Sequence, residues 1–133
     1  MHKIFLVEDE KMVADVIKHF LEHKGYETVI ANNLKDGMDL FSNEFEVVLL
    51  DIQLGMETSF PLLKRIKEEN PNTLVLMFSG YDSEEYIREA KKLGADGFIP
   101  KPFRVEFLDD FLLPKLDYMR RKREREEETK SKE

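Results

Sequence analysis

Five short apolar segments alternate with segments of helical periodicity along this chain, and that alternation constrains its fold more than any other feature. The apolar segments cover residues 3–7, 27–31, 46–50, 73–78 and 97–100. The third is apolar at almost every position, as is typical of a strand buried on both faces of a parallel sheet. Right-handed helical crossovers between such strands place helices on both faces. The pattern therefore predicts an α/β fold with a doubly wound, five-stranded parallel sheet.

Residues that start and stop helices lie between these segments. Apolar residues at helical spacing run from position 12 to Gly25, and glycine commonly ends helices. Side chains that favour helix N-termini precede the next three helical segments: Asn32 or Asn33, Ser59 and Ser83. We expect the fifth helix to begin at Arg104.

Size and composition exclude several classes of protein. The chain has 133 residues, which suits one domain, and no cysteine, which excludes disulfides and thiol chemistry. Its net charge of −7 disfavours nonspecific DNA binding, and no helix-turn-helix pattern is present, so we expect no direct nucleic-acid binding. No apolar run approaches the roughly 20 residues that a membrane span needs, and the first residues read as a strand rather than a signal peptide. We therefore expect a cytoplasmic protein.

The C-terminal segment has a different composition from the rest of the chain. Residues 120–133 carry twelve charged side chains in fourteen positions and no apolar one. We therefore assign residues 1–119 to the folded domain and 120–133 to a charged extension. The extension is either a solvated helix end that frays into disorder or a helix that continues toward a partner.

Polar residues follow four of the predicted strands, each at the point where its strand ends. Glu8 and Asp9 follow the first, Asp51 the third, Ser79 the fourth and Lys101 the fifth. Because parallel strands end at one edge of the sheet, and open α/β sheets bind ligands there, we expect these side chains to converge.

This set of residues suits phosphoryl transfer to a carboxylate. An aspartate can attack a phosphoryl group and hold it as an acyl phosphate. A divalent cation held by carboxylates offsets the negative charge of both reactants, and Mg²⁺ takes few protein ligands plus substrate oxygens. A lysine and a hydroxyl can bind the remaining phosphoryl oxygens.

Four segments carry a family resemblance: LVEDE (6–10), VVLLDIQ (47–53), LMFSG (76–80) and GADGFIPKPF (94–103). By these motifs, from residue 3 to about 119, the chain resembles the receiver domain of two-component response regulators. The resemblance implies a flavodoxin-like sheet of strand order 2-1-3-4-5. It also implies a switch that catalyses its own phosphorylation and dephosphorylation rather than an enzyme that turns over an external substrate.

The resemblance implies a role for each residue of the predicted site. Asp51 would accept the phosphoryl group from a phosphohistidine on a sensor histidine kinase or a phosphotransfer protein. Ser79 and Lys101 would bind phosphoryl oxygens. The ligands of Mg²⁺, or of Mn²⁺ in its place, would be Glu8, Asp9, Asp51 and the Gln53 backbone carbonyl. Further positions would be a switching aromatic at Phe98, a cis peptide bond before Pro102, and control of water access at Gln53 and Tyr81.

Three positions depart from the family pattern. Glu8 stands where aspartate is usual, which affects the expected metal affinity. Gly55 and Ser59 stand where the family favours proline and glycine. Because glycine is more flexible than proline, we expect a looser loop after Asp51.

Other functions remain as alternatives to the phosphorylated switch. A degenerate receiver would bind a protein partner without phosphate. A small phosphohydrolase is disfavoured, because that chemistry needs a second acid two residues after the nucleophile and Gln53 stands there. His19 and His23 match H-x-x-E-H, an inverted zinc-protease motif, but the opposite face of their helix forms the core stripe, no third ligand is evident and no catalytic cleft would open there.

The fifth helix carries more apolar residues than one core contact needs. Family resemblance places the fourth helix, fifth strand and fifth helix at the surface used for dimers or downstream targets. We expect Phe107 and Phe111 to be partly exposed there and to form a homodimer or partner surface that phosphorylation tightens. Pro114 is expected to kink or restart this helix.

Overall fold

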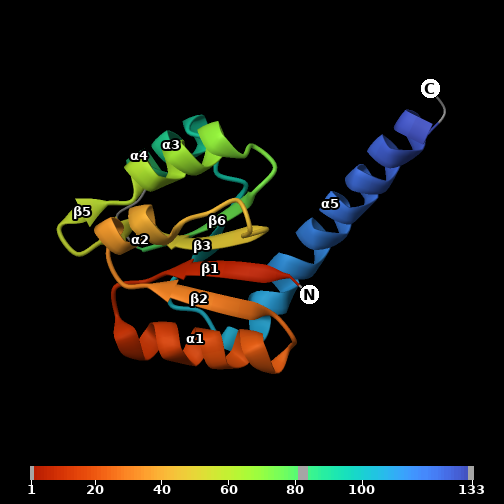
Figure 1. Cartoon of the computed structure of the whole chain (residues 1–133). Helices are drawn as coiled ribbons and strands as arrows, with labels where there is room; N and C mark the ends of the chain where they lie inside the picture. Colours follow the sequence, from red (N-terminus) through yellow and green to blue (C-terminus); the bar gives the residue numbers. More distant parts are fainter. Residues whose placement is uncertain (1, 81–83, 132–133) are drawn as a thin grey trace. The chain divides into compact units, whose positions relative to one another are not determined.

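The computed structural model describes residues 2–80 and 84–131 and separates into two units, Met1–Phe103 and Arg104–Glu133. The first unit contains one five-stranded parallel sheet (Figure 1). Its strands in spatial order are β2 (Glu27–Ala31), β1 (Lys3–Val7), β3 (Val47–Asp51), β6 (Leu74–Ser79) and β7 (Gly97–Pro100). Numbered by sheet strand alone, this order is 2-1-3-4-5. The predicted α/β fold and strand order are therefore confirmed.

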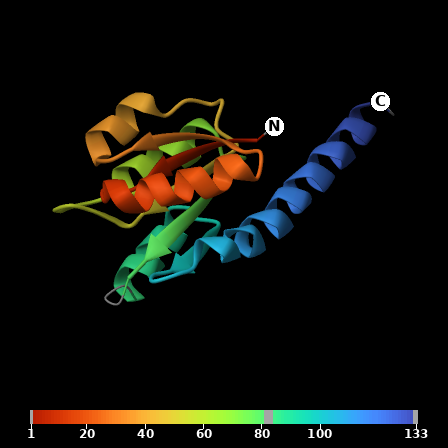
Figure 2. The ribbon, with the colours of Figure 1, turned by 90° about the horizontal axis from the view of Figure 1, so that it is seen from below.

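Helices cover both faces of the sheet. The helix α1 (Lys11–His23) lies on one face, and α2 (Leu34–Leu40), α3 (Phe60–Glu69) and α4 (Glu84–Lys92) lie on the other (Figures 1 and 2). Strand side chains alternate between the two faces, so each strand supplies apolar groups to both layers. All five residues of β3 are buried, as the apolar run in the sequence predicts.

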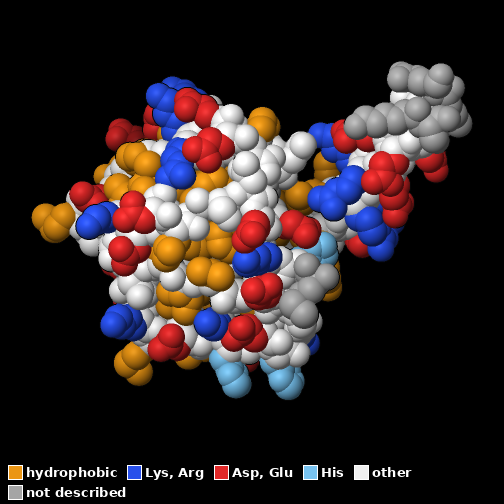
Figure 3. Space-filling model, viewed as in Figure 1, with side chains coloured by type: hydrophobic (Ala, Val, Ile, Leu, Met, Phe, Trp, Pro, Cys, Tyr) orange, Lys and Arg blue, Asp and Glu red, His pale blue; other side chains and the backbone are white. Residues whose placement is uncertain are grey.

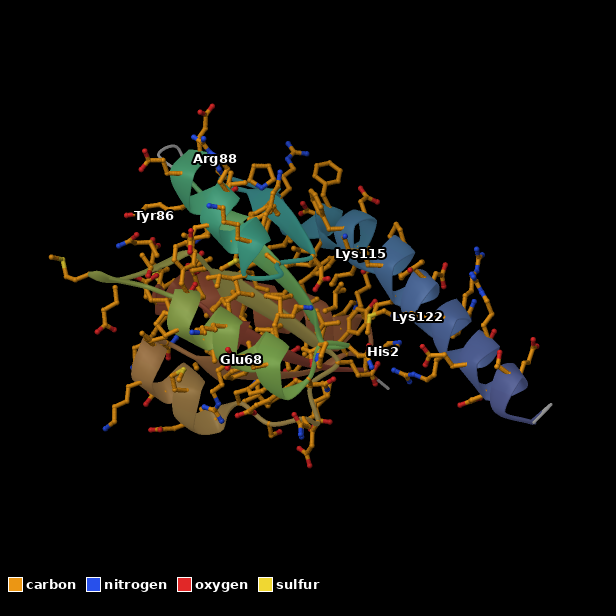
Figure 4. The ribbon with its side chains drawn as sticks, turned by 90° about the horizontal axis from the view of Figure 1, so that it is seen from above. His2, Glu68, Tyr86, Arg88, Lys115 and Lys122 are labelled. Atoms are coloured by element: carbon orange, nitrogen blue, oxygen red, sulfur yellow. The ribbon has the colours of Figure 1, made fainter. Side chains whose placement is uncertain are left out.

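The core under α2, α3 and α4 combines aliphatic and aromatic packing. Its strand residues include Phe5, Val7, Val48, Leu50, Val75 and Met77, and its fully buried helix residues include Leu62, Leu63 and Ile66. Phe60 of α3 contacts Tyr86 of α4 edge-on, with ring centroids 5.8 Å apart (Tyr86 is labelled in Figure 4). Such pairs add to the stabilisation from burial alone.

The three predicted helix caps differ in outcome. The Asn33 side chain accepts a hydrogen bond of 2.7 Å from the Asp36 backbone N–H, as predicted. Ser59 occupies the N-cap position of α3, but its buried hydroxyl makes no hydrogen bond among the described residues, so the side-chain cap predicted there is wrong. The Ser59 backbone carbonyl instead accepts hydrogen bonds from the N–H groups of Leu62 and Leu63. Ser83 lies outside the described residues.

An antiparallel hairpin follows β3 and was not predicted from the sequence. Its strands are β4 (Gln53–Leu54) and β5 (Glu57–Thr58), joined by Gly55 and Met56. Gly55 has a φ of 62°, and a type II′ turn requires a positive φ at its first central residue. Glycine adopts a positive φ without strain. Glycine at this position permits a hairpin turn that proline, with its φ fixed near −65°, would prevent.

The second unit is helical. The 3₁₀ turn η1 (Val105–Phe107) precedes α5 (Leu108–Ser131), and the C-terminal half of α5 carries mainly acidic and basic side chains (Figure 3). The helix continues through Pro114 without restarting. The Phe107 side chain is 50% exposed and Phe111 is partly buried.

Within residues 2–80 and 84–131, none of the helices combines the length and apolar character that a bilayer span requires.

A charged hydrogen-bond network ties the end of α3 to the sheet. The Lys67 ammonium contacts the Asp96 carboxylate at 2.6 Å and donates to the Thr73 carbonyl at 2.7 Å. The same Asp96 oxygen accepts the Val75 N–H at 2.8 Å, and the Asp96 N–H donates to the Val75 carbonyl. The Lys67 side chain is 14% exposed and the Asp96 side chain is 33% exposed, so water is only partly excluded from this network. It fixes the segment before β7 against the start of β6.

Lys67→Met should lower the free energy of unfolding by about 1.5–3 kcal/mol, because it removes charge-assisted bonds and leaves Asp96 with fewer partners. Glu69→Gln is the matched control, since it breaks the exposed Arg65–Glu69 pair on the same helix and should cost no more than about 0.5 kcal/mol. Urea denaturation measures both changes. Equal losses in the two variants would show that the network is not a principal restraint.

Candidate functional site

The sheet register brings the predicted site residues to one edge. In the β1–β3 pair Val7 lies opposite Leu50, so Glu8 and Asp51 each come one residue later. In the β3–β6 pair Asp51 lies opposite Phe78, which places Ser79 one residue further. Parallel strands thus deliver these side chains to the edge of the sheet at which ligands bind in open α/β folds.

Lys101 joins the two buried acids of this edge. Its ammonium group lies 2.8 Å from Asp51 Oδ1, and 3.2 and 3.1 Å from the two carboxylate oxygens of Glu8. Glu8 is fully buried and Asp51 is nearly so. Removing a carboxylate from water is costly unless a counter-charge compensates it, and one lysine here serves both acids.

Aromatic packing supports the position of Lys101. Its ammonium lies 5.5 Å from the centroid of the Phe78 ring, within the range of a cation–π contact. The same Phe78 ring stacks on the ring of Phe103, with centroids 5.1 Å apart and an interplanar angle of 5°. Residues from β6 and from the segment after β7 thus restrict where the lysine side chain can lie. The peptide bond between Lys101 and Pro102 is cis.

The site also fits a divalent cation. Ligand atoms of Glu8, Asp9 and Asp51 lie within 4.8 Å of one another. With Lys101, these three carboxylates carry a net formal charge of −2, which a divalent cation would neutralise. Carboxylate oxygens are the hard ligands that Mg²⁺ prefers, so the donor set is chemically suitable for it.

The environment of Asp51 influences its proton affinity in two opposing ways. Burial raises the pKa of the Asp51 carboxyl above its ordinary value, and it is the largest effect. The hydrogen bond and the positive charge of Lys101 act in the opposite direction but do not fully cancel it. Lys101 therefore favours the ionised carboxylate that a nucleophile requires.

Asp9 lies in different surroundings from the other two acids. It is exposed, and its Oδ2 accepts a hydrogen bond of 3.0 Å from the Gly55 backbone N–H in the unpredicted hairpin. Nearby, the Asn32 side chain donates a hydrogen bond of 3.0 Å to the Glu8 backbone carbonyl. This bond restrains the peptide group that joins Glu8 to Asp9, directly after β1. Sequence patterns did not reveal either contact, because a backbone donor and a lone amide carry no recognisable spacing.

The remaining predicted positions lie around this cluster. Ser79 is buried at the end of β6, and its carbonyl accepts the Lys101 N–H at 2.8 Å. Phe98 on β7 is partly buried, with the Lys91 ammonium 6.0 Å from its ring centroid. Gln53 is exposed at the start of the hairpin, and Tyr81 lies outside the described residues.

His19 and His23 do not belong to this cluster. Both are exposed on α1, whose buried residues are Ala14, Ile17 and Leu21. Among the described residues, the group of three potential metal ligands is formed by acids alone.

Curated relatives of this chain include transcriptional regulatory proteins. It is 37% identical over 109 residues to the transcriptional regulatory protein CrdR of Helicobacter pylori, an alignment that covers 80% of this chain and 51% of CrdR. It is 30% identical over 103 residues to the transcriptional regulatory protein CpxR of Escherichia coli K12, covering 77% of this chain and 44% of CpxR. The chain thus spans about half the length of these relatives.

Solved structures share the fold over nearly the whole chain. A CheY-like response regulator receiver domain protein from Methanospirillum hungatei JF-1 superposes with a TM-score of 0.86 and is 31% identical, covering 92% of this chain and 98% of that one. NtrX from Brucella abortus has a TM-score of 0.85 and 30% identity, covering 96% of this chain and 29% of NtrX. Residues 4–112 also match the response regulator receiver domain family. The chain therefore belongs to the family of response regulator receiver domains.

Proposed function

We propose that this protein is a phosphorylation-controlled switch in which Asp51 accepts a phosphoryl group from a phosphohistidine on a sensor histidine kinase or phosphotransfer protein. The observation that carries this proposal is the Lys101 ammonium held between Asp51 and Glu8, with Asp9 beside them. A nucleophile, a cation-binding acid group and a fixed positive charge share one sheet edge. These are the components that acyl phosphate formation requires.

The proposed transfer exchanges one bond to phosphorus for another. An ionised oxygen of Asp51 attacks the phosphorus, and a P–O bond forms as the P–N bond to the donor histidine breaks. The electron pair of that bond returns to the histidine ring nitrogen. Lys101 then binds a phosphoryl oxygen in place of the Asp51 carboxylate, and the Ser79 hydroxyl, one strand away, donates to another.

Glu8, Asp9, Asp51 and the Gln53 backbone carbonyl are the proposed ligands of Mg²⁺, with Mn²⁺ as a substitute. When bound, the cation would neutralise charge that develops on the phosphoryl oxygens. Lys101 contacts Glu8 and Asp51, whereas Asp9 is exposed and accepts its hydrogen bond from Gly55. Asp9 therefore lies where a cation from solvent would first meet the site.

The output of the switch is proposed to involve Ser79, Phe98 and an apolar surface. Phe98 lies on β7 and is only partly buried, so a change at Ser79 on the neighbouring strand β6, or at Lys101 directly after β7, can alter its environment. We propose residues 1–119 as the receiver domain and 120–133 as a charged extension, in a cytoplasmic protein that turns over no external substrate. Phe107 and Phe111 are the proposed surface for a homodimer or downstream partner.

Asp51→Asn should abolish labelling by acetyl phosphate and Mg²⁺, because an amide oxygen is a far weaker nucleophile than a carboxylate. Intact mass spectrometry should show one added phosphoryl group on the wild type and none on the variant. Asp39→Asn, the same change at an exposed position on α2, should label like the wild type. An unlabelled wild type would instead favour a degenerate receiver that binds partners without phosphate.

Mg²⁺ should raise the melting temperature of the wild type, because the acidic cluster exists only in the folded state. A cation at a hundred times its Kd stabilises the folded state by about 2.7 kcal/mol. Asp9→Asn should reduce this effect strongly, whereas Asp39→Asn should leave it unchanged. Scanning calorimetry with and without Mg²⁺ measures the shift, and an identical shift in Asp9→Asn would remove Asp9 from the ligand set.

A further inference from the structure

A backbone amide from the hairpin contacts the exposed acid of the site. The Gly55 N–H donates to Asp9 Oδ2 at 3.0 Å, although 46 residues separate the two in the sequence. The donor belongs to the turn between β4 and β5, and the acceptor follows β1. The hairpin is therefore linked directly to one of the three carboxylates that suit a cation.

The base of this hairpin is fixed to the sheet. The Ile52 N–H donates to the Phe78 carbonyl at 3.2 Å, and the Ile52 carbonyl accepts the Ser59 N–H at 2.8 Å. Leu54 is 4% exposed and belongs to the core beneath α2, α3 and α4. Because residues on both sides of the turn are held, the Gly55 amide has a defined position relative to Asp51.

Asp9 needs such a restraint more than its neighbours do. Glu8 and Asp51 are buried and share Lys101, so their carboxylates are already oriented. Asp9 is exposed, and the contact with Gly55 engages one of its two oxygens. A hydrogen bond to one carboxylate oxygen limits side-chain rotation and leaves the other oxygen able to bind a ligand. Contacts of this kind commonly orient metal ligands.

We propose that the Gly55 amide is a positioning group for Asp9 and that it couples the order of the β4–β5 hairpin to cation binding. The proposal rests on the proposed function of the acidic cluster as a cation site. If the hairpin in this position favours cation binding, thermodynamic reciprocity requires that the cation favour this position of the hairpin. Occupancy of the site is then transmitted to Met56, which is 98% exposed at the tip of the turn.

The backbone geometry at Gly55 offers a clean pair of substitutions. Proline has no N–H and a φ fixed near −65°, so Gly55→Pro removes both the donor and the turn. Asparagine keeps the N–H and tolerates positive φ better than most residues, and a Cβ atom added at this position meets no atom within 4 Å. Gly55→Asn is therefore the control that retains the donor.

Calorimetric titration with Mg²⁺ and hydrogen exchange of the hairpin test the proposal together. Gly55→Pro should weaken Mg²⁺ binding about tenfold or more, as loss of a ligand-orienting contact commonly does, and Gly55→Asn should weaken it much less. In the wild type, Mg²⁺ should slow amide exchange in residues 52–59. The same measurement on Asp9→Ala, which leaves the hairpin sequence intact, should show no such slowing.

The outcomes separate this inference from the function on which it rests. Wild-type protein that binds Mg²⁺ with no change in exchange over residues 52–59, and with equal affinity in Gly55→Pro, would overturn the coupling and leave the cation site standing. Wild-type protein that binds no Mg²⁺ would overturn both.

Discussion

The contact of one lysine with two buried carboxylates is the interaction on which this site depends. Glu8 and Asp51 end neighbouring strands, and their burial without a counter-charge would be strongly unfavourable. Lys101 reaches both from the end of β7, two strands away from β3 in the sheet. The charge balance of the edge therefore requires that β1, β3 and β7 lie in one parallel sheet, and the fold and the chemistry of the site share one constraint. Aromatic packing of Phe78 against Phe103 restricts the lysine further.

The hairpin and the lysine divide the acids into two classes. Glu8 and Asp51 are oriented by a positive charge in a largely water-excluded position, whereas Asp9 is oriented by a backbone amide at the surface. A site of this kind holds Asp51, the proposed nucleophile, in place while leaving Asp9, a proposed cation ligand, exposed to solvent. The departure from the family pattern at Gly55 thus has a structural consequence, because only a residue with an N–H and a positive φ can make this contact at the turn.

Sequence reasoning predicted the parts of the molecule that periodicity and strand ends determine. The strands and the convergence of Glu8, Asp9, Asp51 and Lys101 follow from alternating apolar runs and from parallel topology, and the strand order follows from the family resemblance. It missed the β4–β5 hairpin, because two-residue strands carry no measurable period. It wrongly assigned a side-chain cap to Ser59, whose hydroxyl is buried while its backbone carbonyl receives the N–H groups of the first turn. These features depend on local backbone geometry that residue types alone do not determine.

The pKa of the Asp51 carboxyl, followed by carbon-13 NMR in the wild type and in Lys101→Met, tests the role of the lysine most directly. Burial raises this pKa and Lys101 lowers it, so removal of the ammonium should raise it further. The account predicts a wild-type pKa above the ordinary aspartate value and a higher one in Lys101→Met, both measured without divalent cations. An unchanged or lower pKa in the variant would show that Lys101 does not favour the ionised form of Asp51, and would contradict the account.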